Sequence, residues 1–193
     1  MRAFADGLVL RERMRAAQSV LVLTGAGVSA ESGVPTFRGG GNTAVWKGMP
    51  FEVISSARML ERDLPAVWEW FNYRRNLLAN LKPNAAHRTI ASWQECFPYL
   101  SLVTQNIDGL HQAAGSRDVI ELHGNVWRAR CFDCEARYDL NEVNLQEIVP
   151  SCFDCGGNLR PDVVLFGEML PPGAFERAAD AAQRIVSGET ALD

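Results

Sequence analysis

The sequence predicts an α/β fold in which a parallel sheet is joined to a small inserted module. Two short, continuous apolar runs, Ser19–Leu23 and Tyr99–Thr104, have the character of strands buried on both faces. Helical segments alternate with these runs, and a cysteine-punctuated stretch over residues 131–160 interrupts the alternation. Because strands that alternate with helices are typical of parallel sheets, we expect one domain over residues 1–193 that carries this stretch as an insertion.

The individual elements follow from local patterns. Residues 50–81 are rich in Trp, Leu, Arg and Glu, and Asn84 is a suitable N-cap for the helix behind it. The predicted helices cover residues 8–18, most of 50–81, 85–95 and 174–186. The predicted strands cover residues 19–23, 99–104, 118–122 and 162–166, the last as a strand or an extended edge. The cysteine segment is expected to be polar, with little core of its own.

Composition argues against several classes of protein. The chain has 193 residues, of which 47% are hydrophobic and 22% are charged, and its net charge is −4. This balance offers no basic surface, so we expect no direct nucleic-acid partner. No apolar run approaches the roughly 20 residues of a membrane span, and the N-terminus lacks the continuous apolar stretch of a signal peptide. We therefore expect a cytoplasmic monomer with no membrane contact.

A glycine-rich turn directly follows the first predicted strand. Gly25-Ala26-Gly27-Val-Ser-Ala30 fits the pattern G-x-G-x-x-[G/A], in which the first glycine permits a tight turn and the second lets the backbone approach a pyrophosphate. A turn without a ligand is the plain alternative. A dehydrogenase would also carry an acidic residue about 20 residues further on, but this interval holds a glycine-rich loop that we expect to be mobile, Gly33–Asn42. The pattern favours nucleotide binding, and it disfavours an ordinary dehydrogenase.

Four of the five cysteines form two C-x-x-C pairs, Cys131/Cys134 and Cys152/Cys155. The 17 residues between the pairs, 135–151, fall inside the spacing of zinc sites with four sulfur ligands. Because the protein would fill all four positions of a tetrahedron, we expect one structural zinc ion. A redox role for either pair is the alternative, and the presence of the second pair argues against it.

Several other residues are expected to be structural. Gly156 and its neighbour suit the tight turn of a zinc ribbon after the last cysteine pair. The fifth cysteine, Cys96, has apolar neighbours and is expected to be buried packing. His87 is expected to face inward on its helix, and His111 is likewise expected to be structural although it lies near the polar residues described next.

Polar residues follow the ends of two predicted strands. Gln105, Asn106 and Asp108 come after the strand at 99–104, and His123 comes after the next one. Because ligands of open α/β sheets bind outside the carboxyl ends of the strands, we expect these side chains to converge near the glycine turn. Asn106 and Asp108 can hydrogen-bond an amide, and His123 can act as a general base near neutral pH. Taken singly, each residue also has a purely structural interpretation, as part of a turn or as a hydrogen-bonded histidine.

Taken together, five motifs resemble the sirtuin family. They are Gly25–Arg38 (GAGVSAESGVPTFR), Thr104–His111 (TQNIDGLH), Leu122–Gly124 (LHG), the four cysteines, and Arg160–Glu168 (RPDVVLFGE). Their order and spacing are similar to those of the family from about residue 8 to about residue 186. The resemblance is to bacterial-type NAD-dependent protein lysine deacylases, nearest to the branch that removes succinyl and malonyl groups.

The resemblance implies a Rossmann-like, NAD-binding part with a helical and zinc-binding module. The NAD-binding part would comprise residues 8–42, 84–125 and 161–186, the helical part of the module residues 43–83, and the zinc-binding part residues 128–160. In the family reaction the acyl oxygen of an acylated lysine on a protein substrate attacks the ribose carbon as nicotinamide leaves. Transfer of the acyl group then yields O-acyl-ADP-ribose and free lysine.

Roles for individual residues come from the same resemblance. His123 would be the general base, with Asn106 and Asp108 completing the catalytic set. Contacts with NAD would come from Gly25, Ala26, Gly27, Thr36, Phe37, Arg38, Gln105, Asn106, Ile107 and Asp108. The edge that pairs with the substrate peptide would be formed by Val163, Val164, Phe166 and Gly167, by addition of a strand.

One further match concerns the acyl group. Sirtuins that prefer acidic acyl chains carry Tyr-x-x-Arg on the helix that lines the acyl pocket, and a small residue nearby. Arg74 is in register with that arginine, Phe71 stands in place of the tyrosine, and Ser55 falls where the small residue is expected. We expect weakened removal of succinyl or malonyl groups, with acetyl or longer apolar groups as the alternative substrates. The plain alternative makes Arg74 and Arg75 solvated charges on a helix.

The family normally continues beyond the last helix with elements that complete the sheet and cover the adenosine. The sequence after that helix, residues 187–193, contains none of them. A Rossmann-like sheet that is incomplete at its C-terminal end is therefore expected, because either the sequence is a part of a longer chain or the protein is truncated. Three alternatives to the deacylase stay open: a mono-ADP-ribosyltransferase, a catalytically inactive NAD-binding protein, and an interaction protein built on a zinc ribbon.

Overall fold

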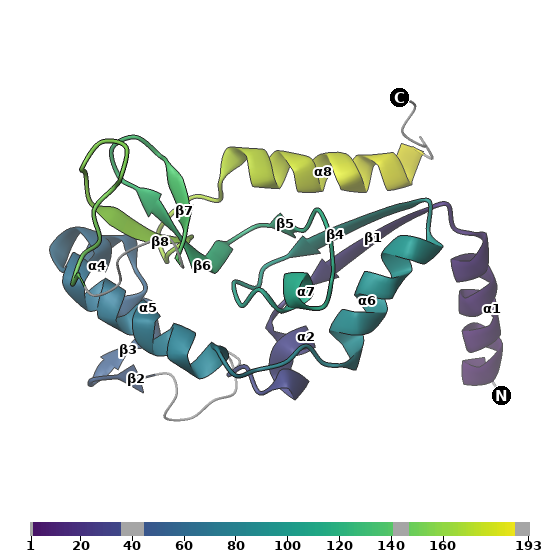
Figure 1. The fold of residues 1–193 in the computed structure, drawn as a ribbon. Coiled ribbons are helices and arrows are strands. Elements are labelled where there is room, and N and C mark those ends of the chain that lie inside the picture. Colours follow the sequence, from purple (N-terminus) through teal and green to yellow (C-terminus); the bar gives the residue numbers. More distant parts are fainter. Residues whose placement is uncertain (1, 36–44, 141–146, 188–193) are drawn as a thin grey trace.

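The parallel sheet lies between two layers of helices in the computed structural model (Figure 1), which describes residues 2–35, 45–140 and 147–187. Its strands are β1 (Ser19–Thr24), β4 (Tyr99–Thr104) and β5 (Ile120–Glu121), in the order β1-β4-β5. The long helix α8 (Pro172–Ser187) covers one face, and α6 (Ala85–Cys96) and α7 (Leu110–Ala113) lie on the other. The predicted parallel α/β sheet is thus confirmed.

The strand register brings the ends of β1 and β4 to the same level. Ser19 pairs with Tyr99 and Thr24 with Thr104, so both strands end at one edge of the sheet. The third strand, predicted over 118–122, is shorter because Asp118 has a left-handed backbone (φ 51°) that an extended strand does not permit. Burial of β1 on both faces was wrong at Leu23, which is 62% exposed.

The helices outside the sheet agree in type with the sequence patterns and differ in their bounds. Helix α1 (Arg2–Ala16) begins earlier than predicted, and the glycine turn leads into the single-turn helix α2 (Ala26–Ser29) and a 3₁₀ turn (Ala30–Ser32). Asn84 caps α6 as predicted, accepting from Ala86 and His87 N–H groups.

Three helices and a short hairpin form the helical module. The hairpin of β2 (Val45–Trp46) and β3 (Met49–Pro50) was not predicted; α3 (Phe51–Ile54), α4 (Ala57–Arg62) and α5 (Leu64–Leu78) were predicted only as a mainly helical segment. Two caps divide that segment, since Ser56 accepts from the Met59 N–H and Asp63 from the Ala66 N–H. Side-chain caps therefore explain why one apolar segment folds as separate helices.

Helix α5 packs between two hydrophobic clusters. One face carries Trp68 into a zinc-module cluster whose other buried members are Ala129, Cys131, Leu140, Cys152 and Leu159. The Trp68 indole N–H donates to the Leu159 carbonyl over 2.8 Å. An adjacent face buries Val67, Trp70, Phe71 and Leu78 in a larger cluster that includes Trp46, Phe51, Ile54, Leu110, Val126, Val163 and Leu165.

The cysteine segment is an antiparallel sheet in the order β7-β6-β8. Its strands are β6 (Gly124–Cys131), β7 (Arg137–Asp139) and β8 (Leu159–Val163). The segment was predicted to have little core of its own, and its interior is a small cluster that it shares with Trp68 of α5. The strands β6 and β7, which were not predicted, carry the charged residues Arg128 and Arg137. Both form ion pairs at 3.3 Å with Asp162 on β8, which is 8% exposed. The strand predicted at 162–166 accordingly lies at 159–163.

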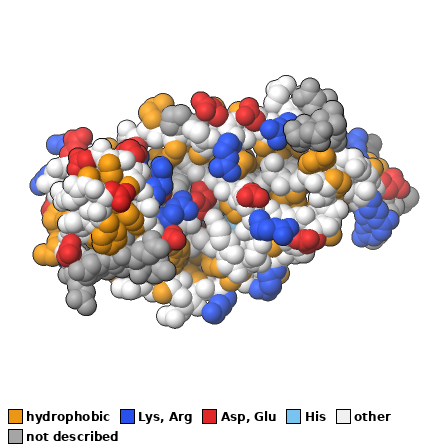
Figure 2. Space-filling model, turned by 45° about the horizontal axis from the view of Figure 1, so that its top comes forward, with side chains coloured by type: hydrophobic (Ala, Val, Ile, Leu, Met, Phe, Trp, Pro, Cys, Tyr) orange, Lys and Arg blue, Asp and Glu red, His pale blue; other side chains and the backbone are white. Residues whose placement is uncertain are grey.

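The surface shows no patch of a single charge on the face in Figure 2, where basic and acidic side chains are interspersed. Within the described ranges, none of the helices combines the length and the apolar character that crossing a membrane requires.

Gly124 joins the parallel sheet to the cysteine module. It has φ 76°, and a Cβ at this position would lie 2.1 Å from the Asp162 carbonyl oxygen on β8. Because Gly124 has no side chain, β8 can approach the backbone at the residue that follows His123. The His123 carbonyl accepts from the Val164 N–H over 2.9 Å. A glycine is required here for both reasons.

We expect Gly124→Ala to destabilise the fold far more than Gly48→Ala. Gly48 has a similar φ of 80° but nothing within 4 Å of its Cβ position, so its variant bears only the left-handed backbone cost of about 1 to 2 kcal/mol. The clash at Gly124 adds roughly 1 to 3 kcal/mol. Urea unfolding followed by circular dichroism measures both, and equal midpoints for the two variants would contradict the close approach of β8.

Candidate functional site

The ends of β1 and β4 place the glycine turn beside the polar residues after β4. The Gln105 N–H donates to the Thr24 carbonyl over 3.0 Å, which continues the pairing one residue past the strands. The Gln105 side-chain oxygen lies 3.9 Å from where a Cβ of Gly25 would be. Gln105, Asn106, Asp108 and the turn therefore converge as the strand ends predicted.

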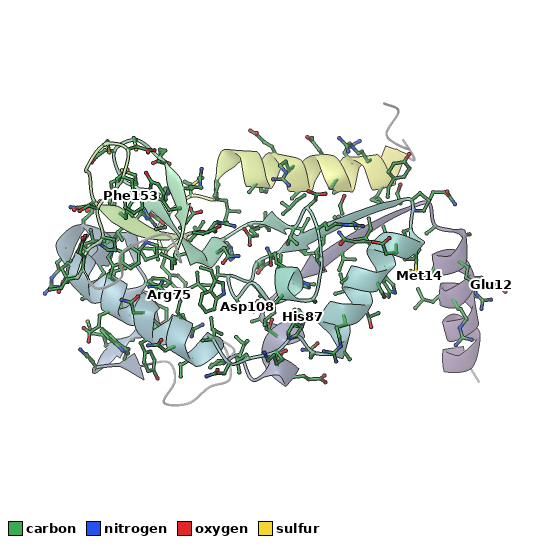
Figure 3. All side chains as sticks on the ribbon, viewed as in Figure 1. Glu12, Met14, Arg75, His87, Asp108 and Phe153 are labelled. Atoms are coloured by element: carbon green, nitrogen blue, oxygen red, sulfur yellow. The ribbon has the colours of Figure 1, made fainter. Side chains whose placement is uncertain are left out.

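A buried hydroxyl connects the two strand ends. The Ser29 hydroxyl donates to Asp108 Oδ2 over 2.7 Å, and it accepts from the Asn106 amide over 3.0 Å. Its third partner is His87 Nε2, at 3.3 Å. Ser29 is completely buried and Asp108 is 7% exposed, so these bonds satisfy groups that water cannot reach. Figure 3 shows how the His87 and Asp108 side chains lie between α6 and the segment before α7.

The tautomer of His87 follows from its partners. The backbone N–H of Asn84 can only donate, and it lies 3.3 Å from His87 Nδ1, so Nδ1 is the acceptor. The proton is then on Nε2, which donates to Ser29. Burial lowers the pKa of His87, and the nearby Asp108 opposes this shift. His87 is inward-facing as predicted, but its contact with the site was missed.

Behind this network, a second histidine is bonded to the two strand ends. His111 Nε2 lies 2.9 Å from the Thr24 hydroxyl, which donates to the Thr104 hydroxyl over 2.9 Å. Since that hydroxyl proton is used, His111 donates through Nε2. Burial, and then the neighbouring His87 ring at 4.8 Å, lower the pKa of His111 to about 4.

His123 has the opposite tautomer. Its Nδ1 lies 2.8 Å from the backbone carbonyl of Gln105, and a carbonyl only accepts, so the proton is on Nδ1. Nε2 then carries a lone pair on a half-buried ring at the strand-end cluster. The neighbouring N–H of Leu122 donates to the Thr104 carbonyl, which fixes the backbone of this turn next to β4.

Three of the predicted NAD contacts, Thr36, Phe37 and Arg38, lie outside the described residues, as does most of the loop expected to be mobile. Ile107 is partly buried against the large cluster, and its carbonyl accepts from the Val126 N–H over 2.9 Å. Ala26 begins the single-turn α2 helix, which carries Ser29.

The four paired cysteines fit a tetrahedral metal site. Their sulfur atoms all lie within 4.8 Å of one another, with Cys131 and Cys155 at 3.5 Å and Cys134 and Cys152 at 3.6 Å. A zinc ion bound to four sulfurs at about 2.3 Å separates them by about 3.8 Å. The donor set and its spacing therefore match one structural zinc ion, as predicted. The fifth, Cys96, is exposed at the end of α6, so its predicted burial was wrong.

The predicted peptide edge is attached to the helical module. The Phe166 N–H donates to the Ser55 carbonyl, and the Phe166 carbonyl accepts from the Ala57 N–H, both over 2.9 Å. Ser55 also accepts from the Trp70 indole N–H over 2.8 Å. A cleft of about 490 Å³ opens beside this edge, lined in part by Val163, Val164 and residues 169–171.

Arg74 and Arg75 are not solvated charges. Arg74 is 8% exposed, and its guanidinium lies 5.6 Å from the centre of the Trp70 ring. Burial lowers its pKa, while nearby Tyr73 and Asp108 act in the opposite direction. Arg75 is 5% exposed and donates to the Val126 carbonyl over 3.2 Å. Phe71, also buried, lies one turn before Arg74 on the same helix.

The fold and the site define a parallel α/β protein with a four-cysteine module. The family model described as Sir2 family matches residues 25–187. NAD-dependent protein deacylase 1 of Caldanaerobacter subterraneus subsp. tengcongensis is 45% identical over 179 residues, which is 93% of this chain and 73% of that protein. The chain therefore belongs to the Sir2, or sirtuin, family, as the motifs predicted.

Solved structures agree with this assignment. A Sir2 homologue in complex with NAD is 40% identical, with a TM-score of 0.78 over 89% of this chain and 67% of that chain. A Sir2–p53 peptide–NAD+ complex is 34% identical, with a TM-score of 0.76 over 91% and 70% of the two chains. This chain covers 67% and 70% of the two solved chains, so both of them are longer than this one.

We expect buried, neutral His111 to make the protein less stable as pH falls from 6.5 to 4. Its pKa is lowered from 6.5 to about 4 on folding, so between these values the unfolded chain binds a proton that the folded chain does not. The loss amounts to at most about 3 kcal/mol, and it is complete below pH 4 because both states are then protonated. The urea unfolding midpoint should fall less between pH 6.5 and pH 4 in His111→Asn than in the wild type. Equal falls in the two proteins would rule out His111 as the source of this pH dependence.

Proposed function

We propose that this chain removes acyl groups from lysine side chains of proteins in an NAD-dependent reaction. Its family and the names of its relatives support NAD-dependent deacylation. The products would be free lysine, nicotinamide and O-acyl-ADP-ribose.

The observation that carries the proposal is the state of His123. Its Nδ1 proton is held by the Gln105 carbonyl, which leaves Nε2 free to take a proton from a substrate hydroxyl. The same segment supplies Asn106 and Asp108, whose positions are fixed by Ser29. A base with a defined tautomer is therefore bonded to the strand-end segment that also carries rigid amide and carboxyl groups, and this arrangement suits proton transfer from a sugar hydroxyl.

The remaining residues of the site are proposed to bind different parts of NAD. Bound NAD supplies the ribose carbon that is attacked and the nicotinamide that leaves. We propose that Gly25, Ala26 and Gly27 contact the pyrophosphate, with Thr36, Phe37 and Arg38 in the loop that follows. Gln105 and Asn106 would contact the ribose side, while Ile107 and Asp108 would recognise the nicotinamide amide.

We propose that the substrate peptide pairs with the edge formed by Val163, Val164, Phe166 and Gly167. The solved Sir2–p53 peptide–NAD+ complex supports a peptide substrate for this fold. Gly167 has φ 88°, so the chain turns away directly behind the proposed edge. Phe166 is 51% exposed and meets Phe51 edge-on at 5.6 Å, which holds an aromatic ring at the edge where an acyl-lysine would enter.

We expect His123→Ala to lower deacylation by about 10² to 10⁴-fold, because the variant lacks the general base. The measurement is NAD-dependent release of acetyl and succinyl groups from lysine peptides, followed by mass spectrometry. Exposed Gln112→Ala on α7 is the control and should retain wild-type rates. Full activity in His123→Ala would refute the assignment, and ADP-ribose attached to protein with the lysine still acylated would identify a mono-ADP-ribosyltransferase.

We further propose that Arg74 recognises an acidic acyl chain, with Phe71 and Ser55 lining the same pocket. Arg74 is buried beside Trp70 and within the electrostatic influence of Asp108, and a guanidinium can hold a carboxyl group with two parallel hydrogen bonds. Phe71 offers no hydroxyl, so one bond is absent relative to the Tyr-x-x-Arg pattern.

We expect Arg74→Met to lower the ratio of succinyl to acetyl kcat/KM by about 10 to 100-fold, the worth of a hydrogen bond between charged groups. Arg62→Met makes the same change at an exposed position at the end of α4 and should leave the ratio unchanged. Measured kcat/KM values for both peptides decide the matter, and an unaltered ratio in Arg74→Met would overturn the role of this arginine.

A further inference from the structure

The four-cysteine site has a side-chain hydroxyl against one of its sulfurs. Tyr138 on β7 places its hydroxyl 3.0 Å from the sulfur of Cys152, which belongs to the second cysteine pair. The Tyr138 ring also meets the Phe153 ring edge-on, with centroids 5.3 Å apart and planes at 87°. Figure 3 shows Phe153 in the cysteine module, on the side of the molecule away from α1.

This hydroxyl differs from the other partners of the sulfurs. The Asp133 backbone N–H donates to Cys131 over 3.3 Å. Backbone hydrogen bonds from Ala136 and Gly157 stabilise the thiolates of Cys134 and Cys155, respectively. Those donors are fixed by the two tight turns. The Tyr138 hydroxyl, by contrast, comes from a separate strand that reaches across to the second pair.

The sulfur that Tyr138 contacts is one of the two that connect the site to the core. Cys131 and Cys152 are 0% and 4% exposed and pack in the cluster with Trp68, whereas Cys134 and Cys155 are exposed. A chelator or a competing proton reaches the exposed pair directly. The ion is released only when the buried sulfurs have also dissociated from it.

We propose that the Tyr138 hydroxyl is a positioning group of the metal site that slows loss of the zinc ion by donating a hydrogen bond to Cys152. A metal-bound cysteine sulfur is a thiolate and only accepts, so the phenol is the donor in the loaded protein. The hydrogen bond stabilises the charge on the sulfur. The role concerns retention of the ion and does not depend on the proposed deacylation.

Tyr138→Phe tests the proposal, because it removes the oxygen and keeps the ring. In the zinc-loaded full chain, transfer of zinc to the chelator 4-(2-pyridylazo)resorcinol should be about tenfold faster in this variant than in the wild type. Tyr99→Phe removes a hydroxyl at the start of β4, in the other sheet, and should not change the rate. A wild-type rate in Tyr138→Phe would overturn the proposal.

Cobalt substitution separates the hydrogen bond from packing. A hydrogen bond lowers the energy of the sulfur lone pair, so its loss should shift the sulfur-to-Co²⁺ charge-transfer band of Tyr138→Phe to longer wavelength. Phe153→Leu keeps the hydroxyl and should retain the band and a release rate near that of the wild type. Faster release with an unshifted band in Tyr138→Phe, or equal acceleration in Phe153→Leu, would assign the effect to the ring contact and overturn the proposal.

A third arm covers the case in which Tyr138→Phe holds no metal. Growth on 3-fluorotyrosine replaces the three tyrosines and makes each phenol a stronger donor without changing its shape appreciably. The cobalt band of this otherwise unaltered chain should move to shorter wavelength if the phenol donates to Cys152. An unshifted band would overturn the proposal.

Discussion

A buried carboxyl group, that of Asp108, is the constraint on which the site depends. Burying such a group without partners costs several kcal/mol, so each of its oxygens needs a donor. Oδ2 accepts from the Ser29 hydroxyl after β1, and Oδ1 accepts from the Leu110 N–H at the start of α7. The Asp108 backbone carbonyl accepts from the Trp127 indole on β6 over 2.8 Å. One residue thereby fixes the first strand end, a helix and the first strand of the cysteine module.

The same network explains why two histidines near the site have different capacities. A backbone N–H sets the tautomer of His87, and a backbone carbonyl sets that of His123. Both nitrogens of His87 are engaged and its ring is fully buried, so it can orient Ser29 but has no lone pair for a substrate. His123 keeps its Nε2 lone pair on a half-buried ring. The identity of the backbone partner, and not the residue type, decides which histidine can be a base.

Several features were predictable because short stretches of sequence determine them. The strands at 19–24 and 99–104, the Asn84 cap and the spacing of the cysteines are local patterns, and each was recognised from the residues alone. The antiparallel sheet of the cysteine module was not, because its strands β6 and β7 carry the charged residues Arg128 and Arg137, whose ion-pair partner Asp162 lies far along the chain on β8. The bond from His87 to Ser29 spans 58 residues and has no local signal. The Asn-x-x-His spacing at the N-terminus of α6 resembles a capping box. It was the one local sequence signal that could have indicated a fixed orientation of the His87 ring.

Helix α5 connects the four-cysteine site to the region of the proposed acyl pocket. Trp68 packs against Cys131 and Cys152, and Trp70, two residues later, bonds Ser55 behind the proposed peptide edge. Since a rigid helix cannot move one of these rings and leave the other in place, the four-cysteine site indirectly holds Trp70 and its bond to Ser55 in position.

Arg74 lies on this helix, and its burial requires an explanation. A cation in an apolar cluster loses its hydration, and the loss must be compensated. The Trp70 face and the field of Asp108 act against this loss. Under the proposed function, this arginine gives the acyl pocket a positive charge at a fixed place on a rigid helix. A fixed guanidinium can hold a carboxylate with two parallel hydrogen bonds, which is the property that an acidic acyl chain would use.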